Sequence, residues 1–377
     1  MEKKEIVIVG GGIFGAYLVA NFRDSSASLR RRIHITLVEP RDDFVYLPLN
    51  IRNCIEDVSD YEVKPYDRIF TKYPELGEVK KDRAIEIDEV NKIVKLLSGD
   101  ELKYDYLIVA TGTNYNAPNQ IPLSSHADIL AYFESQRQLI KDNYHFIIIG
   151  GGATGCELAA EINDRFRNTK KVTLIHNNRL PLSDIYSEKL RQKVLTYLLQ
   201  SRVEVMLRSK GVDNGDGSVT VTRKVYEKEE IETVRGNVVF KLYAQSPATE
   251  WMPDSWKDDH GRIRVNSMLQ VDSASADGSI FAIGDITNIL EAKTAGKAHS
   301  QLPVVVKNVA SLIADSKAVR EYIPQEVESI ALSMGKWRST GQVGIPLIGP
   351  VLVPSWLLLK LMGTHVGAEQ GVKPIGY

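Results

Sequence analysis

The chain has 377 residues, which is enough for two or three domains. Its apolar (43%) and charged (25%) fractions are ordinary for a globular protein, and its formal net charge of -1 argues against general nucleic-acid binding. The two cysteines, Cys54 and Cys156, are too few for a disulfide framework. The N-terminus has no presequence pattern, and Glu2 excludes N-myristoylation, so we expect a cytoplasmic protein.

The N-terminal part of the chain has the pattern of a β-α-β unit. An apolar strand over 5–9 leads into a glycine-rich turn, an apolar helix follows, and a second strand over 33–38 ends at Glu39. The turn reads Gly10, Gly11, Gly12, Ile13, Phe14 and Gly15. This Gly-x-Gly-x-x-Gly spacing, with an acid at the end of the next strand, is typical of a domain that binds a dinucleotide.

Each position of such a turn has a physical role. Gly10 makes the tight turn, Gly12 lets the backbone approach a pyrophosphate, and Gly15 lets helix and strand pack closely. The helix N-terminus then offers unpaired N–H groups to the phosphates. Glu39 is placed to accept hydrogen bonds from a ribose hydroxyl. It lies 29 residues after Gly10 instead of the usual ~20, and the polar loop before Ile33 accounts for the excess.

A second unit of the same kind begins near residue 146, with Gly150, Gly152 and Gly155 in its turn. No acid follows its second strand, where His176 stands instead. An acid there would repel a 2′-phosphate, so His176 predicts that NADPH is accepted as well as NADH; a plain strand-end residue is the alternative. Glu157, in the first helical turn, is expected beside the nicotinamide, although the helix dipole alone also favours an acid there.

Two further strands end in short glycine motifs, over 105–110 into Thr111-Gly112 and over 279–283 into Gly284-Asp285. We therefore expect an α/β fold with two Rossmann-like dinucleotide-binding domains and a small C-terminal region. The expected division is a first domain in two parts, 1–115 and 247–320, a second domain over 116–246, and a C-terminal region with an apolar tail over 321–377.

In combination these motifs resemble the two-dinucleotide-binding-domain flavoproteins over residues 5 to about 315. Within that superfamily the chain is most similar to the apoptosis-inducing-factor-like branch that includes ferroptosis suppressor proteins and fungal relatives. The matching segments are GCELAAE (155–161), VTLIH (172–176), FAIGD (281–285) and LSMG (332–335), followed by Gly341-Gln342. The resemblance implies an FAD-dependent NAD(P)H:quinone oxidoreductase.

The resemblance also places cofactor contacts on this sequence. The implied FAD contacts are the 10–15 turn, Glu39, Arg52, Ala84, Thr111, Gly112, Gly284 and Asp285. The implied contacts of NADH or NADPH are Gly150, Gly152, Gly155, Glu157 and His176. Lys293 and the helix expected from there to about residue 314 would stabilise negative charge on the reduced flavin. Glu157 and Lys293 are the predicted catalytic residues, and no metal site is expected.

The acceptor of the electrons is less closely defined by the sequence. Cys54 and Cys156 are 102 residues apart, so a dithiol relay is not expected, and electrons should pass directly from the flavin to a quinone-type acceptor. Monodehydroascorbate or a ferredoxin are alternatives on the same scaffold. A flavoprotein of apoptosis-inducing-factor type that acts in cell-death or oxidative-stress signalling with little turnover is the alternative from a different class. The sequence leaves oligomerisation open.

The segment 343–363 is long and apolar, with Lys360 as its only charge. Its three prolines argue against one uninterrupted membrane-spanning helix. We expect mainly a buried core or interface segment, with an element that faces a membrane surface or a quinone as the alternative. Through it the protein would contact a membrane, lipid-droplet or mitochondrial surface peripherally.

Overall fold

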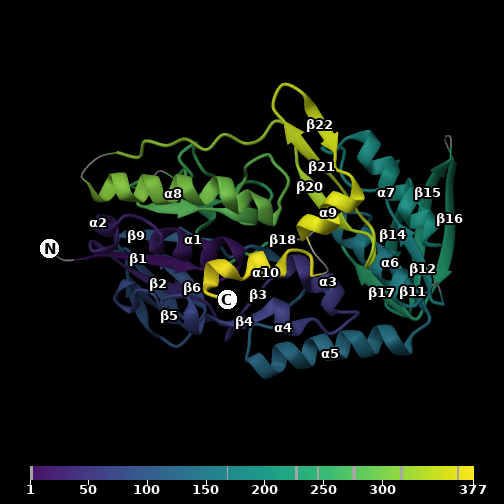
Figure 1. Cartoon of the computed structure of the whole chain (residues 1–377), viewed down its shortest axis with the longest axis horizontal. Helices are drawn as coiled ribbons and strands as arrows, with labels where there is room; N and C mark the ends of the chain where they lie inside the picture. Colours follow the sequence, from purple (N-terminus) through teal and green to yellow (C-terminus); the bar gives the residue numbers. More distant parts are fainter. Residues whose placement is uncertain are drawn as a thin grey trace.

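The computed structural model of the chain describes residues 3–167, 169–225, 228–243, 246–273, 277–314, 317–362 and 365–377. Two parallel sheets lie side by side, and the C-terminal strands cover the junction between them (Figure 1). The expected α/β fold with two dinucleotide-binding domains is confirmed. Among the described residues, no helix combines the length and the apolar character needed to cross a bilayer.

The first sheet has the strand order β19-β9-β1-β2-β5, with every pairing parallel. Its strands are β1 (Lys4–Val9), β2 (Ile33–Val38), β5 (Gly77–Lys80), β9 (Tyr106–Val109) and β19 (Ile280–Ala282). Because β19 follows the second sheet in the sequence, this domain is assembled from two separate parts of the chain.

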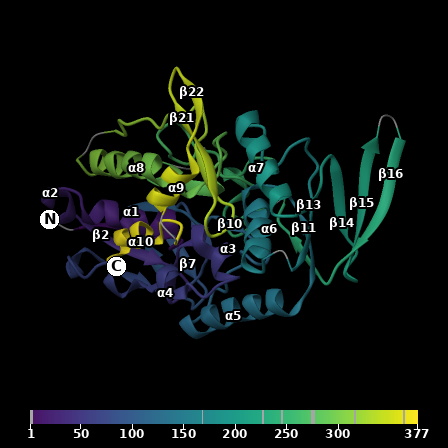
Figure 2. The same ribbon diagram turned by 45° about the vertical axis from the view of Figure 1, so that its right-hand side comes forward.

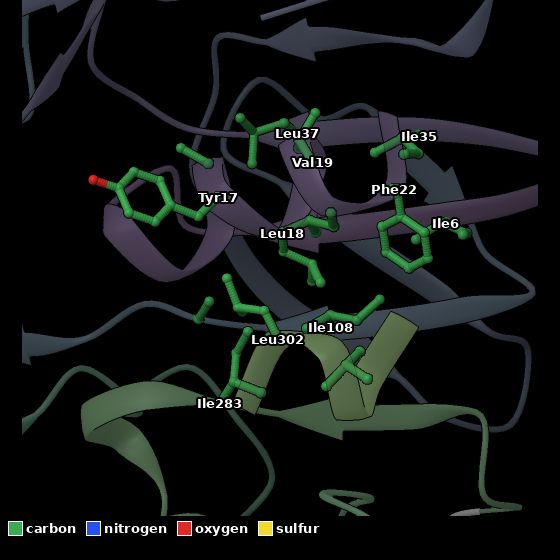
Figure 3. Packing of buried hydrophobic residues seen from close by; sticks show 14 of the residues in the cluster. Ile6, Tyr17, Leu18, Val19, Phe22, Ile35, Leu37, Ile108, Ile283 and Leu302 are labelled. Carbon is green, nitrogen blue, oxygen red and sulfur yellow. The ribbon is translucent and has the colours of Figure 1, made fainter. Parts of the chain in front are cut away.

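Alternating side chains of β1 serve two separate cores. Ile6 and Ile8 face helices α1 (Ile13–Arg23) and α8 (Ala298–Ile313) in one core, and Figure 3 shows Leu18 and Phe22 of α1 directed at this face. Val7 and Val9 face the opposite side, in a core shared with a small antiparallel sheet. That sheet consists of β6 (Ala84–Asp88), β7 (Ile93–Leu96) and β8 (Glu101–Lys103). The first sheet is therefore covered on both faces, as parallel sheets are.

The second sheet has the order β13-β12-β11-β17 and is also parallel. Its strands are β11 (His145–Ile149), β12 (Lys171–Ile175), β13 (Glu204–Met206) and β17 (Val238–Lys241). One face packs on helices α5 (His126–Asp142), α6 (Ala153–Arg165) and α7 (Glu188–Gln200). The other packs on a three-stranded antiparallel sheet that projects from the molecule in Figure 2, formed by β14 (Ser209–Asp213), β15 (Ser218–Val225) and β16 (Lys228–Arg235).

The chain passes between the two domains twice, and the two passages pair with each other. Strand β10 (Thr113–Asn114) lies antiparallel to β18 (Ser246–Pro247), with Thr113 opposite Pro247. This short ribbon supports a division of the chain close to residues 115 and 246, which we propose as the domain boundaries. The remaining short elements before α5 are α2 (Ala27–Arg30), β3 (Asp43–Val45), α3 (Asn50–Asn53), α4 (Ser59–Glu62) and β4 (Val63–Pro65).

The C-terminal region forms an antiparallel sheet over the junction between the domains, and its helix α10 lies against the first domain (Figure 1). Its elements are β20 (Ile330–Ser333), β21 (Ser339–Ile345), β22 (Gly349–Leu352), α9 (Ser355–Met362) and α10 (Ala368–Gly371). A buried cluster connects it to the first domain: Lys297 Nζ lies 3.1 Å from Glu291 and 2.8 Å from Glu328. Gln301 donates to Glu291 and accepts a hydrogen bond from the Gly284 N–H.

Two expectations about local structure need correction. The segment 343–363 is not a buried core segment over its described residues, 343–362, which fold into the β21–β22 hairpin and α9. Leu347, Ile348 and Trp356 are exposed, because each element buries one side only. Residue 363 lies outside the described residues. The helix expected from residue 293 begins five residues later, since a 3₁₀ turn at Ala295–Lys297 precedes α8. Lys293 therefore lies in a loop.

Candidate active site

A cavity of about 750 Å³ runs along the carboxyl edge of the first sheet and reaches helix α6 of the second domain. This volume is in the range of ligand and cofactor pockets. Of the predicted site residues, the lining includes Gly10, Gly12, Ile13, Phe14, Glu39, Ala84, Thr111, Gly112, Glu157, Gly284, Asp285 and Lys293. Gly11, Gly15, Arg52, Gly150, Gly152, Gly155 and His176 lie outside the lining.

The first glycine turn has the geometry that a bound dinucleotide requires. Gly10 has φ +102°, in the region that favours glycine. A Cβ on Gly15 would stand 1.8 Å from the Gly10 carbonyl oxygen, so only glycine fits at this position in the first turn of α1. A Cβ on Gly12 would meet nothing within 4 Å. Gly12 therefore borders open cavity at the helix N-terminus, where pyrophosphate oxygens accept from free N–H groups.

Glu39 is held in place by the protein itself. The Gly11 N–H donates to Glu39 Oε2 at 2.6 Å, and Arg41 donates to both carboxylate oxygens at 2.7 and 3.1 Å. Tyr66 donates to the Gly11 carbonyl at 2.6 Å. Burial of these charges is tolerated because the pair is bidentate and hydrogen-bonded. Arg41 also lines the cavity, so a ribose would meet a Glu–Arg pair, not a lone carboxylate.

Asp285 follows β19 and lies in the cavity wall with two hydroxyl donors. Tyr115 donates to its Oδ2 at 3.1 Å and Thr113 at 3.3 Å. Burial raises the pKa of Asp285, and the hydrogen bonds and nearby Lys293 counter part of that rise. The carboxyl group can accept from, or donate to, hydroxyl groups of a bound ligand, which suits the ribityl chain of a flavin.

Lys293 lines the cavity, but its ammonium group is already satisfied. It donates to the carbonyl oxygens of Thr287 and Ile289 at 2.9 and 3.0 Å and approaches Thr287 Oγ1 at 3.3 Å. These contacts use its three hydrogens. Burial, with the neighbouring Arg262, lowers the pKa of Lys293 to about 8. In this arrangement Lys293 acts on the cavity through its charge, because no hydrogen remains for direct donation.

Glu157 reaches the same cavity from α6 in the second domain, where it lies in the second turn and not in the first as the sequence indicated. Its Oε1 accepts a 2.9 Å hydrogen bond from the backbone N–H of Ser333 in β20. Burial, reinforced by the carboxylate of Glu161, raises the pKa of Glu157 to about 8, although the Ser333 N–H and Arg52 act in the opposite direction. The cavity thus presents a carboxyl group that can hold a proton near neutral pH.

The expectation that Arg52 contacts the flavin does not fit the structure. Its guanidinium group lies 2.5 Å from Glu161 Oε1 and 2.6 Å from Ser333 Oγ, outside the cavity lining. The first domain, the second domain and the C-terminal region meet at these three buried side chains. Arg52 therefore connects the two domains and the C-terminal region. Its guanidinium group can be buried because the carboxylate of Glu161 balances its charge.

The second glycine turn repeats the geometry of the first. Gly150 has φ +116°, a Cβ on Gly155 would stand 1.9 Å from the Gly150 carbonyl oxygen, and a Cβ on Gly152 would meet nothing within 4 Å. His176 takes the structural place of Glu39: its Nδ1 lies 3.1 Å from the Gly151 nitrogen, which donates to it. The ring is then unprotonated at Nδ1, and burial lowers the pKa of His176 accordingly.

Neither cysteine has the environment of a redox thiol. Cys54 and Cys156 are free and fully buried, and burial raises the pKa of both thiols well above the usual range. Neither lines the cavity. Among the described residues, no group of His, Cys, Asp and Glu is arranged to hold a metal ion.

Sequence reasoning missed several residues that line the cavity. Arg41, Thr113 and Tyr115 contact the predicted acids Glu39 and Asp285. Their positions next to motifs could have identified them as cavity residues. Arg41 stands two residues after Glu39, and Thr113 and Tyr115 follow the Thr111-Gly112 turn. The contribution of Glu250 and Trp251 from the segment after β18 has no comparable local signal.

A family model described as pyridine nucleotide-disulphide oxidoreductase matches residues 4–301. The chain belongs to this family. Together with the two glycine turns, the match and the sequence relatives identify an FAD-dependent NAD(P)H oxidoreductase of the apoptosis-inducing-factor type. The disulphide chemistry in the family's description has no counterpart here, because the two thiols are buried outside the cavity.

Relatives in sequence extend over almost the whole chain. Apoptosis-inducing factor homolog A of Dictyostelium discoideum is 28% identical over 402 residues, covering 99% of this chain and 94% of its own. Ferroptosis suppressor protein 1 of Mus musculus is 30% identical over 361 residues, covering 92% and 91%. The resemblance to apoptosis-inducing factors and ferroptosis suppressors that the motifs indicated is thereby confirmed.

Solved structures support the fold at lower identity. NDH2 from Plasmodium falciparum, determined in complex with NADH, aligns with a TM-score of 0.79 at 14% identity, covering 99% of this chain and 97% of that one. The sulfide:quinone oxidoreductase from Aquifex aeolicus aligns with a TM-score of 0.74 at 16% identity, covering 98% and 90%.

Variants of the equivalent glycines Gly12 and Gly152 test the two predicted cofactor sites one at a time. We expect Gly12→Val to abolish retention of flavin, because its side chain would fill the space that a pyrophosphate needs. Gly152→Val should retain flavin while KM for NAD(P)H rises by roughly tenfold or more. Flavin absorbance after gel filtration and steady-state kinetics measure both. Equal flavin loss in the two variants would contradict the assignment of the first turn to FAD.

Proposed function

We propose that this oxidoreductase takes a hydride from NAD(P)H on its FAD and delivers the electrons to a quinone-type acceptor. The cavity carries this proposal: it joins Gly12, in the turn proposed for FAD, to Thr154 and Glu157 in the first two turns of α6, the helix that follows the second glycine turn. Bound flavin supplies the hydride-accepting and electron-donating chemistry. The protein supplies one enclosed space in which both ligands meet.

The lining of the cavity supports an apolar acceptor. Apolar side chains from 45–51 and 121–123 form one part of the wall, and Tyr132 adds an aromatic ring from α5. Since the buried thiols offer no dithiol relay, the acceptor must reach the flavin directly. Among similar structures, the Aquifex protein is named a sulfide:quinone oxidoreductase, and its quinone acceptor agrees with this acceptor class.

The site residues divide into roles for binding and for charge. Gly12 and the N-terminus of α1 are proposed to receive the pyrophosphate of FAD, and Asp285 its ribityl hydroxyls. Lys293 places positive charge at the cavity, which favours an anionic reduced flavin. Glu157 is proposed to bind the carboxamide of the nicotinamide. Its carboxyl group would donate a hydrogen bond when protonated and accept one when ionised.

We further propose that the C-terminal region contacts a membrane surface from which a quinone enters. Trp337 and Trp356 are 72% and 67% exposed, and the Ser339 N–H donates to Ser355 Oγ, which brings their segments together. The hairpin tip, at the other end of β21, exposes Leu347 and Ile348, and the hairpin stands out from the molecule in Figures 1 and 2. The adjacent cations are Lys336, Arg338 and Lys360. Exposed tryptophans bordered by cations favour an anionic lipid interface.

The purified protein tests the reaction directly. NADH or NADPH added without oxygen should bleach the flavin absorbance, and a short-chain ubiquinone added afterwards should restore it. If the flavin bleaches but quinone leaves it reduced, the acceptor is of another class. If a bound flavin stays oxidised, the hydride transfer is wrong and a signalling flavoprotein with little turnover is favoured.

Coenzyme choice tests the role of His176. We expect NADH and NADPH to be used with kcat/KM values that differ by far less than roughly a thousandfold, since no acid repels the 2′-phosphate. His176→Asp keeps an acceptor for the Gly151 N–H and should shift preference toward NADH by about tenfold or more. A strong NADH preference in the unmodified protein would overturn this interpretation.

Vesicle binding tests the C-terminal surface. The double variant Trp337→Ser, Trp356→Ser should lose co-sedimentation with vesicles that contain anionic lipid, while turnover of a short-chain quinone in solution is unchanged. Ile231→Ser on β16 removes an equally exposed apolar side chain (68%) from another part of the molecule and should bind vesicles normally. Equal vesicle binding by both variants would exclude this surface as the contact.

A further inference from the structure

The carboxyl group of Glu157 is tied to a buried cluster that no other part of the proposed reaction explains. Its Oε1 accepts from the Ser333 N–H at 2.9 Å. Ser333 in turn donates its hydroxyl to Glu161 Oε1 at 2.5 Å, and Arg52 lies 2.6 Å from the same hydroxyl. Arg52 and Glu161 form an ion pair at 2.5 Å, with side chains only 9% and 6% exposed.

The hydrogen bonds of this cluster link Glu157 to the ion pair, which a contact between domains alone would not require. Glu157 and Glu161 stand one helical turn apart on α6, so both carboxyl groups project toward β20. A single serine satisfies both: its N–H faces Glu157 and its hydroxyl faces Glu161. Because Glu157 Oε1 is occupied as an acceptor, a proton on this carboxyl group belongs on Oε2. The orientation of Glu157 toward the cavity therefore depends on a residue of the C-terminal region.

We propose that Arg52, Glu161 and Ser333 form a positioning unit that aims Glu157 into the cavity and sets its charge, so that the C-terminal region completes the coenzyme site. The proposal rests on the proposed role of Glu157 in hydride transfer from NAD(P)H. The two charges of the pair act on Glu157 in opposite directions: the carboxylate of Glu161 favours the protonated form, and the guanidinium group of Arg52 favours the ionised form.

Other ionisable groups share the cavity and stay unchanged in the test below. They are Glu39, Arg41, Asp82, Arg83, Tyr115, Tyr132, Glu250, Asp285 and Lys293. Lys293 has a pKa near that of Glu157, so a pH dependence alone would not identify the carboxyl group. The Glu157→Gln variant identifies it, because only the titration of Glu157 disappears in that protein.

The opposite charges of the pair provide the decisive experiment. The rate of anaerobic flavin reduction by NADH is measured by stopped flow from pH 6 to pH 10, and the midpoint that is absent from Glu157→Gln is assigned to Glu157. Glu161→Gln should move that midpoint to lower pH by roughly one unit, and Arg52→Gln should move it to higher pH by a similar amount. Arg52→Lys should restore the original midpoint.

The outcomes separate this proposal from simpler ones. A purely structural pair predicts that both variants lose thermal stability with an unmoved midpoint, or with shifts in one direction, and either result overturns the proposal. The proposal is also overturned if every midpoint in the pH profile of the unmodified protein persists in Glu157→Gln. Arg137→Gln is the matched control: this arginine donates to Asn53, next to Arg52 in α3, and should leave the midpoint unchanged. If NADH reduces no flavin at any pH, the proposed function has failed first.

Discussion

The close approach of a helix to a strand at a glycine turn is the constraint on which this molecule depends. At Gly15 and again at Gly155, the first helical turn passes so near the strand's end that a methyl group would overlap a carbonyl oxygen. Only glycine lets the helix start at that point with its N-terminus facing the sheet edge. The cavity lies at this edge, and parallel strands bring their other carboxyl ends to it, which is why Thr111 after β9 and Asp285 after β19 share the lining with Gly12.

The parts that sequence could predict are those in which chemistry and spacing are local. Each glycine turn combines its steric requirement, its strand and its helix within about twenty residues, so both turns and the two-domain fold follow from the sequence. Glu39 and Asp285 belong to the same class, because Glu39 directly follows β2 and Asp285 follows β19 after two residues. Their hydroxyl and guanidinium partners are close in sequence but carry no motif of their own.

The parts that sequence could not predict depend on distant partners. Arg52 was expected at the flavin on the strength of a short motif, but its contacts are Glu161, 109 residues away, and Ser333, 281 residues away. The sequence places the charge of Lys293 near the flavin but does not show that backbone carbonyls of its own loop accept its hydrogens. Apolar composition predicted burial of the C-terminal segment, but a two-stranded hairpin buries one face and exposes the other, so composition overstates its burial.

The ribbon of β10 and β18 has a consequence for how the chain acquires its structure. The described residues between these strands form the second parallel sheet, its helices and the antiparallel sheet β14–β16, whereas the first sheet still lacks β19 when that segment is complete. On a ribosome the coenzyme domain is therefore synthesised in full before the flavin domain can close, and pairing of β19 with β9 brings together residues about 170 positions apart. Such a distant pairing forms slowly, because a long loop must close first. An inserted domain that folds before β19 pairs would shorten that loop, because β10 and β18 at its two ends lie side by side.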